Sequence, residues 1–246
     1  MRAGYDRAFG DGWMVGVLGA SDSGDMKVAE RGAKNESRSR TLGVYAGKEW
    51  NGLALRAGWA MSDHRVTSDR QVAYGTYLER NQARYTSKGQ EGFVEAGYAW
   101  KLGERVTLEP YAQWSRVEVK DPGFKETGGA SALTVAAGRS QTDFGTAGLR
   151  FATRLAQASG QDWLQISGAL AYRVASGDWQ TTTIAGWQNG PQFTSWGAPL
   201  SERATLLNLN VGARLSSNTM LDLGYDGQYG SDSRDHAVNA RLSVKF

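Results

Sequence analysis

Cysteine is absent from this chain of 246 residues, which also holds only 4 prolines and 2 histidines. The lack of cysteine excludes disulfides, thiolate metal sites and cysteine nucleophiles. No run of roughly 20 consecutive apolar residues occurs either, and this excludes a helical membrane protein. The glycine-rich pattern that cradles the phosphates of ATP is missing as well, so we expect no cofactor of that kind.

A strong charge of one sign is also missing. The 28 Lys and Arg residues face 25 Asp and Glu residues, which leaves a formal net charge of +3. Because the basic residues are spread among the acidic ones, we expect no nucleic-acid partner. The N-terminus lacks the basic start and apolar core of a signal peptide. If the protein is exported, we expect this chain to be an internal or mature segment.

The composition on its own favours a soluble protein of one or two domains, because the mean hydropathy is -0.49 and 22% of the residues are charged. A membrane β-barrel keeps a similarly low mean hydropathy, since its strands alternate lipid-facing and lumen-facing residues. The chain has 32 glycines, 9 tryptophans and 10 tyrosines. Aromatic rings with a polar group suit a structure that meets water at two boundaries.

Alternation of apolar and polar residues is the main pattern of the sequence. In the last eleven residues, one face of an extended strand collects Val238, Ala240, Leu242, Val244 and Phe246. The same period of two recurs at 52–63, 93–102, 104–114, 162–174, 206–215 and 220–229. No helical period competes over comparable lengths. We count eleven strands and predict an all-β chain.

The connections between these strands are of two alternating kinds. Short connections built of turn-forming residues lie at 10–12, 50–52, 102–104, 158–160 and 217–218. Longer polar segments lie at 21–39, 65–85, 121–139 and 176–201, with a shorter one near 230–235. Transmembrane barrels have short turns in the periplasm and long loops outside the cell. Four tryptophans beside the short turns suit a periplasmic aromatic girdle: Trp13, Trp50, Trp100 and Trp163.

The polar faces of the strands are rich in small residues and in charges of both signs. This mixture suits the wall of a confined, hydrated lumen, and an ordinary solvated face remains the alternative. We predict twelve pore-lining residues: Arg56, Glu95, Glu109, Tyr111, Gln113, Arg150, Arg173, Asn208, Arg214, Asp222, Asp226 and Arg241. Because the last strands place Arg214, an aspartate and Arg241 side by side, we expect cross-strand pairs there.

Five stretches carry a resemblance to a known family. They are GYDRAFGDGWMVGVLGASDS, SRTLGVYAGKEWNGLALRAGWAMSDHRV, LEPYAQWSRVEV, GTAGLR at 145–150 and the closing ARLSVKF. In their order and spacing they are similar to the C-terminal translocator domain of type V autotransporters, over nearly the whole chain. The terminal Phe246, with Val244 and Leu242 before it, resembles the signal that the outer-membrane assembly machinery reads.

The resemblance implies a 12-stranded antiparallel transmembrane barrel whose pore holds an α-helix linked to an N-terminal passenger. Gly4-Tyr5-Asp6 is similar to the second strand of that family. We therefore expect the first strand and the linker helix upstream of Met1, and we take 1–246 as a single translocator domain. An open sheet edge in lipid would leave backbone groups unsatisfied at several kcal/mol each.

The resemblance also implies a function and partners. The domain would anchor its protein in the outer membrane and support export of the passenger, through or alongside the pore. The implied partners are the passenger and linker helix, the β-barrel assembly machinery, membrane lipids and lipopolysaccharide, and the chain is expected to be a monomer. The long loops are expected outside the cell, with the short turns and the C-terminus in the periplasm.

Two channel or soluble alternatives stay open. A porin-like channel would share the barrel, but it has no reason to encode a long N-terminal passenger. A soluble lectin-like β-protein would have to explain why large apolar residues occupy one face of almost every strand.

Enzymatic alternatives depend on few residues. A barrel-embedded hydrolase would need a histidine base. His64 and His236 are the candidates, with Ser62 or Ser231 as nucleophile, but Gly-x-Ser-x-Gly is absent. We predict that both histidines are surface residues and that the chain is not an enzyme. Self-cleavage of the passenger by acidic lumen residues stays open, although pairing of Glu95, Glu109, Asp222 and Asp226 with arginines is favoured.

Two of the long connections have further expected roles. The basic segment 27–40 is a candidate for contact with lipopolysaccharide phosphates, against the alternative of a merely solvated loop. The segment 181–200 contains Trp187, Phe193 and Trp196 and is too long for a bare loop. We expect it to form an extra hairpin over or beside the pore mouth, with simple loop packing as the alternative.

Overall fold

The computed structural model describes residues 1–28, 32–156, 162–187 and 190–244, most of which lie in β-strands. Within these ranges the one helical element is the short turn η1 (Gly10–Gly12), and no helix there has the length and apolarity to cross a membrane. The strands are β1 (Arg2–Phe9), β2 (Trp13–Val28), β3 (Ala33–Trp50), β4 (Leu53–Tyr74), β5 (Tyr77–Tyr98), β6 (Trp100–Leu102), β7 (Val106–Asp121), β8 (Phe124–Lys125), β9 (Leu133–Val135), β10 (Gly138–Ala156), β11 (Asp162–Gly177), β12 (Thr182–Trp187), β13 (Gln192–Trp196), β14 (Arg203–Arg214), β15 (Thr219–Gly230) and β16 (Arg234–Val244).

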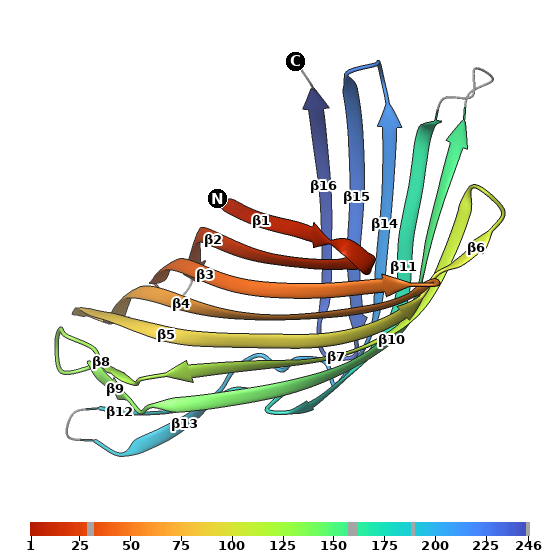
Figure 1. Cartoon of the computed structure of the whole chain (residues 1–246). Coiled ribbons are helices and arrows are strands. Elements are labelled where there is room, and N and C mark those ends of the chain that lie inside the picture. Colours follow the sequence, from red (N-terminus) through yellow and green to blue (C-terminus); the bar gives the residue numbers. More distant parts are fainter. Residues whose placement is uncertain (29–31, 157–161, 188–189, 245–246) are drawn as a thin grey trace.

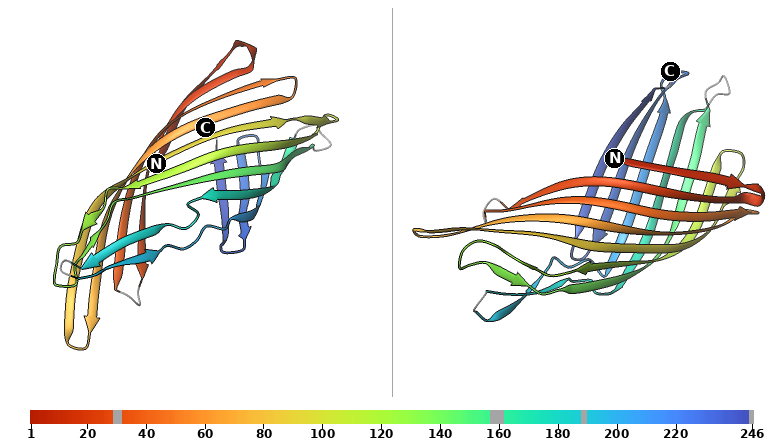
Figure 2. Two further views of the ribbon diagram at one scale, coloured as in Figure 1. Left: turned by 90° about the horizontal axis from the view of Figure 1, so that it is seen from below. Right: turned by 60° about the vertical axis from the view of Figure 1, so that its left-hand side comes forward.

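Eleven strands follow one another in a single antiparallel sheet, in the order β1-β2-β3-β4-β5-β7-β10-β11-β14-β15-β16. The sheet is strongly curled, so that β1 to β5 run at a steep angle to β14, β15 and β16 (Figures 1 and 2). β1 and β16 form its two edges, and no register joins them within the described residues. The prediction of an all-β chain with eleven antiparallel strands is confirmed.

The short strand β6 continues β5 after a break at Ala99. Both strands pair with β7 in one register, and the pairing is interrupted opposite Pro110. Proline has no backbone N–H, so β5 loses one hydrogen bond of the ladder there. Ala99 instead donates its N–H to the carbonyl of Gly52, at 2.7 Å, on the β4 side.

The polarity of the two faces of the sheet is the reverse of that in a soluble protein. Large apolar side chains on the outward face stay exposed along the whole sheet, as for Leu42 (66%), Leu170 (59%) and Leu242 (62%). On the opposite face, polar side chains such as Glu95 (6%) are buried. A soluble sandwich would bury the first set and expose the second. The arrangement fits a sheet whose outward face meets lipid.

Two of the five segments expected to be long polar loops are largely strand, whereas 121–139 and 176–201 contain only short strands. The β2–β3 and β4–β5 hairpins extend through 21–39 and 65–85, and Tyr74 pairs directly with Tyr77. The antiparallel ladder continues because each residue finds a backbone partner, even where the apolar alternation has ended. These two expected loops are therefore corrected to tall hairpins on one rim.

A second sheet lies beside the tips of these hairpins. Its order is β13-β12-β9-β8, so it combines the connection between β7 and β10 with the connection between β11 and β14. The expected extra hairpin within 181–200 is confirmed as β12 and β13. The sheet is tied to the β4–β5 hairpin, because Arg70 binds Glu126 with two hydrogen bonds of 3.1 and 2.5 Å.

Short turns occupy the opposite rim. Asn51 (φ 49°) and Gly52 (φ 86°) connect β3 to β4, and both adopt the left-handed conformation that a two-residue hairpin turn requires. Asp11 (φ 67°) does the same between β1 and β2. The predicted turn at 158–160 falls outside the described residues.

Candidate functional site

The strand register places all twelve predicted pore-lining residues on one face of the sheet. Arg56 lies opposite Glu95, which lies opposite Gln113, and Glu109 lies opposite Arg150. The series continues across β11, β14, β15 and β16 through Asn208, Asp226 and their neighbours of the same parity. We call this the inward face. Alternation on each strand and the antiparallel register are sufficient to produce it.

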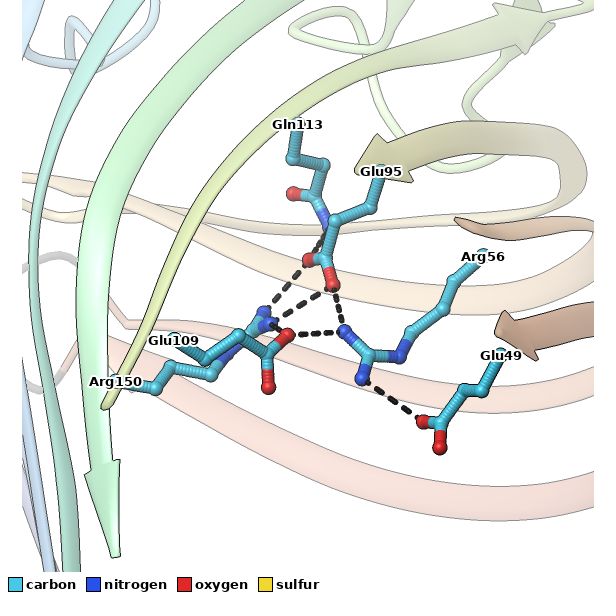
Figure 3. Close-up of polar contacts among 6 residues, drawn as sticks. All are labelled: Glu49, Arg56, Glu95, Glu109, Gln113 and Arg150. Atoms are coloured by element: carbon cyan, nitrogen blue, oxygen red, sulfur yellow. Dashed lines mark hydrogen bonds and ion pairs between the residues drawn. The ribbon is translucent and has the colours of Figure 1, made fainter. Parts of the chain in front are cut away.

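Four residues of the inward face form a charge cluster: Arg56, Glu95, Glu109 and Arg150 (Figure 3). Arg56 Nη1 lies 2.9 Å from Glu95 Oε1 and 2.6 Å from Glu109 Oε1. Arg150 Nη2 lies 2.6 Å from Glu95 Oε2, and its Nη1 lies 3.0 Å from Glu109 Oε1. Arg56 reaches Glu109 across the intervening strand β5, which requires the inward face to be concave.

Further residues complete the surroundings of the charge cluster. Gln113 donates to Glu95 Oε2 at 3.3 Å, and the guanidinium of Arg150 lies 3.7 Å from the ring centre of Tyr111. Gly97 leaves space for Glu109, because a Cβ there would lie 2.5 Å from Glu109 Oε1. Glu49 binds Arg56 Nη2 at 3.4 Å and was missed from the sequence. The sequence did contain a signal for Glu49, because its odd-numbered position on β3 places it on the inward face.

A second polar group lies on the far wall of the inward face. Asn208 donates to Asp226 Oδ1 at 2.5 Å, and Asn210 donates to Asn208 Oδ1 at 2.7 Å. Arg173 donates to Gln228 at 2.9 Å and lies 4.8 Å from the ring centre of Phe144. This wall is therefore held mainly by amide contacts, whereas the charge cluster is held by ion pairs.

The expected ion pairs near the C-terminus differ from the structure. Asp222 lies opposite Arg241 in the β15–β16 register, and Arg214 lies opposite Met220. Among the described residues, none of these three charged side chains forms an ion pair. The opposition of the Cα atoms of Asp222 and Arg241 is therefore not enough to bring their side chains into contact. The expected pairing with arginines is confirmed for Glu95 and Glu109.

The two histidines lie in different settings. His64 is on the inward face, with Nε2 2.8 Å from Ser62 Oγ and Nδ1 2.7 Å from Ser39 Oγ. The side chain is partly exposed at the inward surface, and both ring nitrogens are engaged. His236 is exposed on the outward face and its Nδ1 lies 2.8 Å from the hydroxyl of Tyr225. Within the described part of the chain, no cluster of three His, Cys, Asp or Glu side chains could hold a metal.

The predicted girdle and assembly signal are only partly described. Trp13, Trp50 and Trp100 are exposed on the outward face at the rim of short turns, and Lys48 Nζ lies 5.0 Å from the ring centre of Trp13. Trp163 differs from the other three, because alternation along β11 places it on the side of the inward residues, next to a register shift. Leu242 and Val244 are exposed on β16, and Phe246 falls outside the described residues.

The autotransporter β-domain model matches residues 1–226 of the chain. The chain belongs to this family. It is 32% identical over 213 residues to an extracellular serine protease of Serratia marcescens, with 83% of this chain and 19% of that protein covered. It is 27% identical over 134 residues to outer membrane protein A of Rickettsia rickettsii, with 51% of this chain and 6% of that protein covered. The autotransporter β-domain thus spans about a fifth or less of these relatives.

Solved structures with the same fold are translocator domains. The translocator domain of the autotransporter NalP from Neisseria meningitidis superposes with a TM-score of 0.73 at 12% identity, covering 100% of this chain and 79% of that one. The β-domain of the Bordetella autotransporter Brka gives 0.65 at 21% identity, covering 100% and 89%. Membership of the family makes this chain an outer-membrane translocator domain, which anchors its protein and supports passenger export.

Proposed function

We propose that the inward face of the curled sheet is the surface that accommodates the linker and the passenger during export. The observation that supports this is the concave charge cluster, in which Arg56 on β4 reaches Glu109 on β7 at 2.6 Å across β5. A concave, hydrated wall with charges of both signs accepts a chain of either polarity without binding it tightly. We further propose that 1–246 acts as a single, monomeric domain.

The proposed orientation is based on the two rims. We propose that the tall hairpins and the second sheet lie outside the cell and that the short turns and the C-terminus lie in the periplasm. Outward tryptophans at the rim of short turns support this, since such rings prefer the membrane interface. The exposed outward face would meet membrane lipids and lipopolysaccharide, and Leu242, Val244 and Phe246 would meet the assembly machinery.

We propose that the domain itself is not an enzyme. The ring of His64 contacts two serine hydroxyls and no carboxylate among the described residues, so a base oriented by an acid is not assembled there. Glu95 and Glu109 are each bound by two arginines, so their carboxylate oxygens are already engaged and less accessible to a passenger peptide. Because His64 has no carboxylate among the described residues to orient it as a base, Ser62→Ala should leave passenger processing unchanged.

The experiment uses the protein expressed from its full gene in a Gram-negative host, with a reporter in place of the passenger. Protease is added to intact cells. Digestion of the reporter, with survival of a periplasmic control protein, supports export to the surface. If the barrel inserts and shows heat-modifiable migration while the reporter stays protected, export is refuted. Single-channel conductance would then test the porin-like alternative.

A further inference from the structure

Five basic side chains gather on the outward face of β3, β4 and β5, beyond the exposed apolar side chains of these strands. They are Arg38, Arg40, Arg65, Arg84 and Lys88, and all five are exposed. We call them the outward basic patch. Within the described part of the chain, none of the five forms an ion pair, whereas Arg116 and Arg139, farther along the same face, each bind a carboxylate at 2.8 and 2.7 Å.

The register places like charges directly opposite one another in this patch. Arg38 lies opposite Arg65 in the β3–β4 ladder, and at the border of the patch Lys88 lies opposite Lys120, which binds Glu118 at 2.8 Å. Like charges at directly opposed positions destabilise a sheet. Asp63 lies on the same face, opposite both Arg40 and Lys88, and Glu36 lies two residues from Arg38 along β3, where it binds Lys34. Two carboxylates, one of which already binds Lys34, lie beside five cations, so the patch keeps an excess of positive charge.

The patch is continuous with the apolar part of the same face. Leu42 lies opposite Met61 and is two residues from Arg40 along β3. Both apolar side chains are exposed, at 66% and 46%. A ligand that spans the two regions must therefore carry an anionic group next to a hydrocarbon portion.

Among the described residues, the inward face of the same strands offers no binding partner for the five cations of the outward basic patch. At this level the inward residues are uncharged hydrogen-bonding side chains, such as Ser39, Ser62 and His64. Alternation directs every member of the outward basic patch to the other face. The repulsion among the five cations is therefore confined to the outward face, where an external anion has access to them.

We propose that the outward basic patch binds the phosphate groups of a phosphorylated membrane lipid, whose acyl chains lie along Leu42 and Met61. Guanidinium groups bind phosphate through two parallel hydrogen bonds, which suits the opposed pair Arg38 and Arg65. The inference rests on the proposed orientation of the domain, in which this region meets the headgroups of the outer leaflet.

The test uses protein extracted from outer membranes in mild detergent and titrated with fluorescent lipid A, which carries phosphates. The variant Arg38→Gln/Arg65→Gln should bind about 25-fold more weakly, at about five-fold for each cation near a charged membrane surface. Added salt should weaken wild-type binding, because the contact is exposed. The matched control Lys101→Gln/Arg105→Gln removes two exposed cations from the other rim and should bind as wild type does.

Several results would overturn the inference. The inference is refuted if Arg38→Gln/Arg65→Gln binds lipid A as tightly as the wild type does. It is also refuted if the control Lys101→Gln/Arg105→Gln loses as much affinity, or if the wild type binds dephosphorylated lipid A with equal affinity. Full competition by inorganic phosphate at comparable concentration would make it a free-anion site. If Arg38→Gln/Arg65→Gln misfolds, Arg40→Gln/Lys88→Gln provides the same comparison without altering the Arg38–Arg65 pair. Heat-modifiable migration separates the cases: an unfolded wild type contradicts the proposed function, and a folded wild type that does not bind contradicts only this inference.

Discussion

Glu95 accepts hydrogen bonds from Arg56, Arg150 and Gln113, and its side chain is almost fully covered. Glu95→Gln removes the charge that both arginines share and leaves them with Glu109. A hydrogen bond to a charged group contributes roughly 1.5–3 kcal/mol. We expect the variant to unfold at a lower temperature, measured by the loss of heat-modifiable migration.

The matched control for this prediction is Glu91→Gln on the same strand. Glu91 has the same parity as Glu95, is exposed, and forms no ion pair within the described residues. It should unfold at the wild-type temperature. Equal destabilisation by the two variants would contradict a special role for the charge cluster.

Glu79, near the tip of the β4–β5 hairpin, holds the neighbouring connection by accepting hydrogen bonds. The hydroxyl of Ser131 and the side chain of Tyr77, together with the N–H groups of Ser131 and Ala130, lower the pKa of Glu79 from 4.5 to about 2. Because the folded-state pKa is depressed, the stabilisation is complete above pH 4.5 and is lost as the pH falls toward 2.

We therefore expect the N–H groups of Ala130 and Ser131 to lose protection from hydrogen exchange between pH 4.5 and 2. In Glu79→Gln, exchange normalised for its intrinsic rate should not change with pH over this interval. Unchanged protection of the wild type below pH 2 would contradict the assignment.

At the scale of elements, Pro110 sets the point where β5 separates from β6. Pro110→Val supplies the missing N–H, which can then donate to the carbonyl of the opposite residue on β5. One such bond contributes roughly 1 kcal/mol. We expect slower hydrogen exchange at residues 98–100 and an unchanged or higher unfolding temperature, whereas Pro122→Val, beyond the end of β7, should change neither. Faster exchange at 98–100 would contradict this explanation of the break.

Strand existence and side-chain facing could be predicted from the sequence, because the alternation is a local property. It placed Arg56, Glu95 and Asp226 on one face, as the register has them. Strand length could not be predicted in the same way. Beyond the membrane both faces of a hairpin are polar, so the alternation that marks a strand disappears while the backbone ladder continues.

Contacts between distant segments were also beyond the reach of the sequence. The pairing of β9 with β12 joins two separate connections, and nothing local in Leu133–Val135 marks its partner. The contact of Arg56 with Glu109 depends on the curvature of the sheet, which no residue encodes by itself. Glu49 is different, because it contacts Arg56 on the adjacent strand and its parity on β3 could have placed it on the inward face.

At the scale of the whole molecule, the outward face must tolerate lipid and the inward face must tolerate water. Leu170→Arg places a charge on the outward face between Leu149 and Leu207, and an arginine at the bilayer midplane costs about 2–4 kcal/mol. Ser167→Arg places the same side chain on the inward face of the same strand. We expect a lower yield of folded, heat-modifiable protein for the first variant only. Equal yields would contradict the assignment of the two faces.

The β4–β5 hairpin is the tallest in the sheet, with 22 residues in each strand. At roughly 3.3 Å per residue, each strand is about 70 Å long. A tilted strand needs roughly half of that length to cross an apolar band about 25 Å tall. In the proposed orientation, the turn at Gly75 then projects tens of ångströms above the lipid headgroups. In that orientation the turn would be an epitope that antibodies or bacteriophage can reach on living cells, and a suitable place to insert a peptide for display.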